Sequence, residues 1–92
     1  MSASVRIPTI LRTYTGGAAE VTVAGSTLRE SISDLDMQCP GIAARVLDES
    51  GALRRFVNVY INDDDVRVLD NLDTLILDGV QISIIPAVAG GA

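Results

Sequence analysis

The chain has 92 residues, of which 48% are hydrophobic and 3% aromatic, so it is long enough for one core built from aliphatic side chains. Seven arginines and no lysine face twelve acidic residues, which gives a net charge of −5. Nucleic acids and anionic membranes bind clustered positive charge, so this balance disfavours both as partners. It suits docking onto a basic protein surface.

The cysteine and histidine content of the chain predicts no reactive side chain. The only cysteine, Cys39, excludes an internal disulfide, and histidine, the commonest general base and metal ligand, is missing. Cys39 precedes Pro40 near the expected end of a helix, whereas a reactive thiol needs a helix N-terminus or a cationic neighbour, so we interpret it as structural. The sequence shows neither a leader pattern nor a run approaching the ~20 apolar residues of a membrane span. We expect a cytoplasmic protein.

The first third of the chain predicts a β-hairpin. A weakly alternating run over residues 4–12 predicts a strand that Pro8 interrupts, because proline cannot donate to a sheet ladder. Residues 20–24 predict a second strand. The two are expected to be joined through the turn signal Thr15-Gly16-Gly17.

A helix is expected over residues 28–38. Thr27 and Glu30 fit a capping box, in which the threonine hydroxyl accepts from a backbone N–H and the glutamate reaches back. Apolar residues then recur at helical spacing, and Pro40-Gly41 stops the helix. One further short helical turn is expected around residues 42–47.

The second half of the chain predicts the rest of the sheet. The clearest strand covers residues 55–62, whose alternation places Val57, Val59 and Ile61 on one face and Phe56, Asn58 and Tyr60 on the other. A short strand at 66–68, irregular structure over 70–77 and a final strand over 80–87 follow. The order of hairpin, helix and further strands predicts an α+β fold, with a mixed sheet of four to five strands and one main helix across one face.

The aromatic side of the 55–62 strand is a candidate docking face. If Val57, Val59 and Ile61 cover the helix, Phe56 and Tyr60 line the open face of the sheet, where an exposed apolar patch can bind a partner. The alternative is that both rings are half-buried edge contacts.

No residue pattern predicts catalysis or metal binding by the chain itself. The acidic run Asp63-Asp64-Asp65 lacks the twelve-residue loop and terminal glutamate of an EF-hand, so we interpret it as a solvated turn. We expect no bound cofactor and no catalytic residue.

The remaining feature is the segment after Pro86. We expect a domain over residues 1–87 and a flexible tail over 88–92 that contains Gly90 and Gly91. Extended at ~3.3–3.6 Å per residue, this arm reaches ~20 Å beyond the fold. Val88, Ala89 and Gly90 can thread a narrow channel, since small side chains leave its walls clear.

Three segments carry a resemblance to a known family: Ile7 to Arg12, Arg55 to Asp63, and Ile85 to Gly91. Together they resemble the ubiquitin-like β-grasp sulfur carriers of the ThiS/MoaD family, in particular the actinobacterial carriers of cysteine biosynthesis. The likeness spans nearly the whole chain, and it implies the β-grasp fold.

The resemblance also implies a chemistry. A ubiquitin-activating-type enzyme would use ATP and Mg to adenylate the carboxylate of Gly91, and sulfide or a persulfide would then displace AMP to leave a thiocarboxylate. A pyridoxal-phosphate cysteine synthase acting on O-phosphoserine would accept the sulfur. A zinc metallopeptidase would release the cysteine formed on the carrier. The carrier would not be an enzyme.

Ala92 departs from the family pattern, whose active form ends at the second glycine. Either a protease trims Ala92, or this residue does not belong to the native chain, or the protein is not a carrier. We expect the form that ends at Gly91 to be the substrate for adenylation.

Three alternatives stay open. Within the carriers, the sulfur could go instead to thiamin, molybdopterin or a thiosugar. The chain could be a ubiquitin-like modifier joined to lysines of other proteins. It could also be a plain binding module that docks through Phe56 and Tyr60 without tail chemistry.

Overall fold

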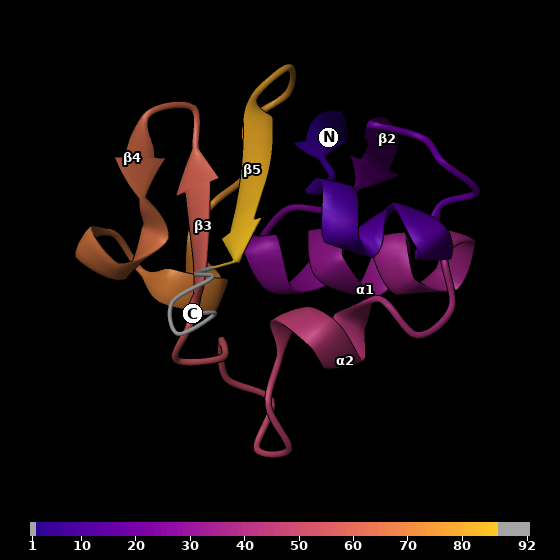
Figure 1. The fold of residues 1–92 in the computed structure, drawn as a ribbon. Coiled ribbons are helices and arrows are strands. Elements are labelled where there is room, and N and C mark those ends of the chain that lie inside the picture. Colours follow the sequence, from indigo (N-terminus) through magenta and orange to yellow (C-terminus); the bar gives the residue numbers. More distant parts are fainter. Residues whose placement is uncertain (1, 87–92) are drawn as a thin grey trace.

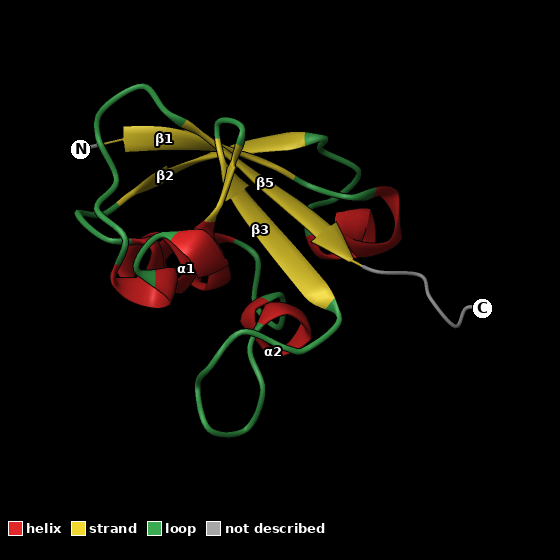
Figure 2. Ribbon diagram, turned by 90° about the vertical axis from the view of Figure 1, so that its left-hand side faces the viewer, coloured by secondary structure: helices red, strands yellow, loops and turns green. Residues whose placement is uncertain are grey.

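Helix α1 (Leu28–Gln38) lies across one face of a five-stranded mixed sheet (Figures 1 and 2). The strands are β1 (Ser2–Arg6), β2 (Glu20–Ala24), β3 (Val57–Ile61), β4 (Asp64–Asp65) and β5 (Gln81–Pro86), in the order β2-β1-β5-β3-β4. The central neighbours β1 and β5 run parallel, and the other pairs run antiparallel. The computed structural model describes residues 2–86, so the expected boundary at residue 87 and the tail over 88–92 lie outside the described residues.

The first predicted strand is wrong beyond Arg6. β1 pairs antiparallel with β2 as expected, but residues Thr9–Tyr14 form a 3₁₀ helix instead of more strand. Pro8 explains the change, because its ring fixes φ at −67° and its carbonyl accepts from the backbone N–H of Leu11 over 2.9 Å. Leu11 is buried all the same, since the helical turn folds it back onto the core.

The α1 helix has the predicted bounds. The Thr27 side chain accepts a hydrogen bond from the Glu30 backbone N–H over 3.2 Å, and the Glu30 carboxylate accepts from the Ser26 N–H over 2.8 Å. These contacts satisfy N–H groups that no helical carbonyl can reach. The expected short turn after Pro40 is α2 (Ala43–Val46).

The region after β3 differs from the prediction in two places. β3 begins at Val57, and the expected strand at 66–68 is a 3₁₀ helix, Val66–Val68. Asp65 starts that helix, because its carboxylate accepts from the backbone N–H of Arg67 over 2.9 Å. The chain reaches this point through a tight turn after β3 in which Asn62 has φ 55°, a conformation that asparagine tolerates.

An aliphatic core fills the space between the helix and the sheet. Val57, Val59 and Ile61 face it from β3, as the alternation predicted. Burying a side chain of this kind stabilises the fold by roughly 1.5–3 kcal/mol. Cys39 is also buried, in agreement with its structural interpretation. Other buried members of the same core are Ala3, Val5, Ile7, Val23, Leu28, Ile32, Leu35, Ile42, Val46, Val66, Ile76, Ile82 and Ile84.

The β2 edge of the sheet is covered by side chains of α1. The Gln38 amide donates to the Thr22 carbonyl over 2.8 Å, and the Asp34 carboxylate accepts from the Ala24 N–H over 3.0 Å. A free strand edge invites pairing with another chain. Two of the outward backbone groups of β2 are therefore already engaged.

Candidate functional site

The strand that leads into the tail is held on both sides. β5 lies between β1 and β3, and its last residue, Pro86, pairs with Val57 at the start of β3. The predicted site residues Val88, Ala89, Gly90, Gly91 and Ala92 lie outside the described residues. The part of the candidate site that the structure describes is therefore the sheet around the end of β5.

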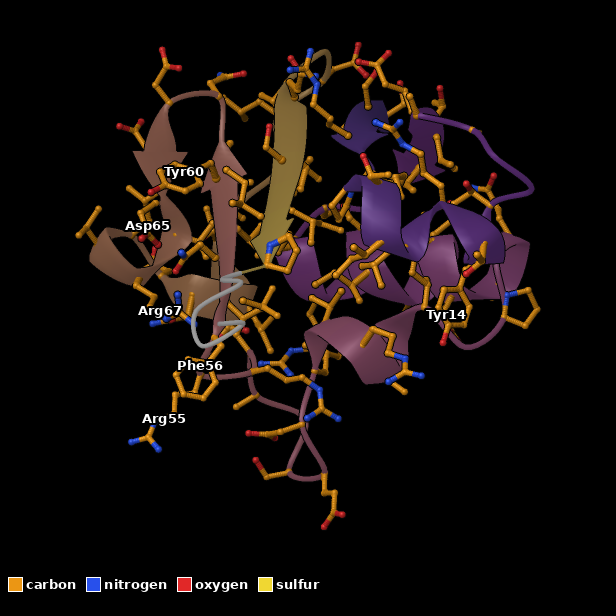
Figure 3. The ribbon with its side chains drawn as sticks, in the orientation of Figure 1. Tyr14, Arg55, Phe56, Tyr60, Asp65 and Arg67 are labelled. Carbon is orange, nitrogen blue, oxygen red and sulfur yellow. The ribbon has the colours of Figure 1, made fainter. Side chains whose placement is uncertain are left out.

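Phe56 and Tyr60 both lie on the side of β3 that faces away from α1, but they do not form one aromatic cluster. Phe56 directly precedes β3 and is 62% exposed, whereas Tyr60 is half-buried near the other end of the strand (Figure 3). Tyr60 pairs with Ser83 in the sheet. Their role in docking stays a prediction.

Ile85 presents an exposed apolar side chain on the neighbouring strand β5. It pairs with Asn58 across the β3–β5 ladder, between the levels of Phe56 and Tyr60, and its side chain is 48% exposed. A shallow hollow is lined by Tyr60 and Ile85 together with Asn62, Asp63 and Ser83. The sequence held a signal for Ile85, because it alternates with the buried Ile84 in the predicted last strand, but the residue was not singled out.

The loop that carries Phe56 is fixed by Arg67. Its guanidinium donates to the backbone carbonyls of Arg54 and Val57 over 2.9 and 2.7 Å, and to the Asn58 side-chain oxygen over 2.7 Å. Phe56 lies between two of these anchor points. Sequence reasoning also missed Arg67, because its partners come from a segment about ten residues away.

Arginine side chains surround the exposed apolar residues. The Arg55 guanidinium lies 5.8 Å from the centre of the Phe56 ring, within the range of a cation–π contact. On the other side of β5, Arg6 and Arg12 line a hollow with Ile7, Pro8 and residues 83–86. The Nε of Arg12 donates to the Ile7 carbonyl over 3.1 Å.

The described part of the chain holds neither a cluster of metal-ligating side chains nor a membrane-spanning helix. Within residues 2–86, no three metal-ligating side chains gather, and the acidic run 63–65 belongs to the β3–β4 hairpin. No helix among those residues is long and apolar enough to cross a membrane. The geometry thus offers a mixed apolar and basic face beside the end of β5, where residues 87–92 begin.

Known proteins match this chain in sequence and in fold. The chain is 52% identical over 93 residues to the sulfur carrier protein CysO of Mycobacterium tuberculosis, covering 99% of this chain and 100% of the relative. The crystal structure of Mycobacterium tuberculosis CysO matches with a TM-score of 0.89 at 49% identity, covering 92% of this chain and 98% of that one. These likenesses confirm the β-grasp fold that the resemblance implied.

Two further structures and one family model complete the comparison. A chain of the Amycolatopsis orientalis BexX/CysO complex matches with a TM-score of 0.91 at 48% identity, covering 97% of this chain and 99% of that one. The small archaeal modifier protein 1 of Methanosarcina acetivorans matches with a TM-score of 0.83 at 27% identity, covering 98% of this chain and 96% of that one. The ThiS family model matches residues 5–91. Because that match takes in almost the whole sequence, the chain belongs to the ThiS family.

Proposed function

We propose that this chain is a sulfur carrier whose working group is the carboxylate of Gly91. The observation that carries the proposal is the extent of the family match, which runs to Gly91 and so includes the glycine pair. A relative with 52% identity is named as a sulfur carrier protein, which supports the same role here.

The chemistry belongs to partner enzymes. A carboxylate is a poor acyl donor, so one oxygen of the Gly91 carboxylate attacks the α-phosphorus of ATP and pyrophosphate leaves. Sulfide then attacks the carbonyl carbon and AMP leaves with its electron pair, which gives the thiocarboxylate. ATP and Mg are bound by the adenylating enzyme, and the carrier supplies a docking face and the tail, without catalysis of its own.

The shape of the described domain fits this division of labour. β5 is a central strand, so the point where the tail begins is fixed relative to Phe56, Tyr60 and Ile85. A partner that binds this face therefore meets Pro86, the last residue of β5, at a constant position, which favours reaction by limiting the search for a productive geometry. A relative was solved in a BexX/CysO complex, which supports function through a protein partner.

The sulfur acceptor we propose is a pyridoxal-phosphate cysteine synthase acting on O-phosphoserine. The carrier thiocarboxylate would replace the phosphate, and the resulting cysteine adduct would be released by a zinc metallopeptidase. The name CysO on the relatives with 52% identity supports this pathway over thiamin, molybdopterin or thiosugar synthesis.

Mass spectrometry tests the proposal directly. Two forms of the chain, ending at Gly91 and at Ala92, are incubated with the adenylating enzyme, ATP, Mg and sulfide. The Gly91 form should gain the mass difference between sulfur and oxygen, and the Ala92 form should not. If neither form is converted, the carrier proposal is wrong. If both forms are converted equally, removal of Ala92 is not required.

A second function has one supporting observation. The small archaeal modifier protein 1 matches the fold with a TM-score of 0.83 at 27% identity. A modifier would be found in cells as an isopeptide-linked adduct on lysines of other proteins. A search for lysines that carry the tryptic fragment 68–91 of this chain as a branch separates this role from a pure carrier.

A further inference from the structure

Arginines bracket the end of β5 from both neighbouring strands. On the β1 side, Arg6 and Arg12 line the hollow that contains residues 83–86. On the β3 side, Arg54 and Arg55 lie three and two residues before Val57, which pairs with Pro86, and Arg67 donates to the carbonyls of Arg54 and Val57. Five of the seven arginines of the chain therefore lie around the point where the tail begins.

None of these five guanidiniums forms an ion pair within residues 2–86, although Arg6 is paired with Glu20 across the β1–β2 ladder. Within residues 2–86, the only ion pair joins Arg29 to Asp73, at 3.4 Å, and Arg29 lies on α1 on the other face of the sheet. The charge of Arg54 contributes to lowering the pKa of the Asp48 carboxyl, after larger contributions from hydrogen bonds of Ser50 and Ala52. Apart from these two neighbouring carboxylates, no ion pair among the described residues neutralises the positive charge at this end.

The opposite end of the same strands is acidic. Asp63 and Asp64 lie at the turn after β3, and Asp78 precedes β5. The pairing of Ile61 with Ile82 places these two ends side by side. The net charge of −5 therefore hides a segregation along the strands, with positive charge at the tail end.

We propose that the tail end of the sheet docks onto an acidic surface of the adenylating enzyme, around the mouth of the channel that takes the tail. The proposal rests on the proposed carrier function. Phe56 and Ile85 form an exposed apolar centre, and the arginines form its charged rim, which is the usual organisation of a protein interface. The net charge of the chain suggested a basic partner surface, whereas the arginines at the end of β5 suit an acidic one.

The arrangement also orients the carrier. An acidic partner surface attracts the arginine end and repels the end with Asp63, Asp64 and Asp78, so that encounters begin with the tail pointing at the channel. Such steering acts on the association rate and weakens as salt screens the charges.

The test is a measurement of association rate against salt. The chain ending at Gly91 and its adenylating enzyme are mixed in stopped flow, with Arg55→Glu, Arg55→Gln and Arg29→Glu as variants. We expect Arg55→Glu to slow association about tenfold at low salt and Arg55→Gln to slow it less, both differences shrinking at high salt. Arg29→Glu makes the same change in net charge and should alter the rate less than about twofold.

Each outcome bears on the proposal. The glutamine variant also loses the guanidinium over Phe56, so the gap between Arg55→Glu and Arg55→Gln isolates charge from ring contact. Equal rates for Arg55→Glu and Arg29→Glu, or faster association of Arg55→Glu, would overturn the acidic docking surface. Thiocarboxylate formation on the unsubstituted chain is measured in parallel. If no thiocarboxylate forms, the carrier function is wrong. If it forms while Arg55→Glu and Arg29→Glu associate at equal rates, only the docking proposal is wrong.

Discussion

The guanidinium of Arg67 donates a hydrogen bond of 2.7 Å to the backbone carbonyl of Val57. This contact takes the place of a strand, because β4 has only two residues and pairs with Tyr60 and Ile61, leaving the start of β3 without a neighbour on that side. One side chain thus closes the sheet edge and holds the loop that presents Phe56.

We predict that Arg67→Ala lowers the free energy of unfolding by about 1–2 kcal/mol, since several hydrogen bonds to backbone and side chain are lost together. Arg67→Lys should recover only part of the loss, because an ammonium cannot span the same acceptors. Denaturant unfolding measures both. Arg29→Ala, which removes an exposed ion pair, is the control and should cost less than about 0.5 kcal/mol. Equal losses for Arg67→Ala and Arg29→Ala would show that the Arg67 contacts do not hold the edge.

Phe56→Ala should weaken binding to the adenylating enzyme by about tenfold or more, because exposed aromatic side chains at the centre of an interface often contribute about 2 kcal/mol. The fold should be little affected, since the ring is 62% exposed. Leu75 is 68% exposed and lies away from β5, beside Thr27, so Leu75→Ala is the matched control. Titration calorimetry would refute the docking role of Phe56 if the two variants bound alike.

Ser31 offers a chance to stabilise the fold. Its hydroxyl is buried under the sheet and finds no hydrogen-bond partner among the described residues. Ser31→Ala removes an unsatisfied polar group and improves helix propensity, so we expect unfolding to cost about 0.5–1 kcal/mol more. Ser33→Ala, at an exposed position of the same helix, reports the propensity effect alone. A Ser31→Ala variant less stable than Ser33→Ala would mean that the hydroxyl has a partner in solution.

Asp78 should make stability depend on pH in acid. The backbone N–H of Ser2 donates to its carboxylate over 2.9 Å and the Ser2 hydroxyl over 3.2 Å, and these bonds lower the pKa of Asp78 below its usual value of 3.8. A carboxyl whose pKa falls on folding stabilises the protein above the unfolded pKa and loses that effect as pH drops through the folded pKa. Asp78→Asn should therefore destabilise the protein at pH near 7 and matter less at pH below about 3. Thermal melts of both proteins across this range give the comparison, and a constant difference would contradict it.

The parts of the fold that the sequence predicted best are those set by local contacts. The bounds of α1 follow from the Thr27 cap and the Pro40 stop, both of which act within a few residues. The prediction of a strand over residues 66–68 is wrong because the structure there depends on contacts beyond the segment itself. Val66 and Val68 alternate like a strand, yet only Val66 is buried, and the Asp65 carboxylate imposes a helical turn. That outcome depends on tertiary packing that alternation does not report.

The candidate site was predicted in a similar way. Phe56 and Tyr60 were placed on the open face by the alternation around Val57 and Val59, which needs only a regular strand. Strand pairing places Ile85 opposite Asn58, and Arg67 holds the loop that carries Phe56 from across a hairpin. Those relationships depend on sheet order and loop geometry, which no single segment of sequence encodes.

The position of β5 between a parallel and an antiparallel neighbour has a mechanical consequence. A force applied to residues beyond Pro86 acts along β5 and loads the ladders to β1 and β3 in shear, so many hydrogen bonds must break together instead of one at a time. The tail can therefore be drawn into a channel and withdrawn without peeling the sheet. Single-molecule pulling from the C-terminus against Ser2 should find a high rupture force.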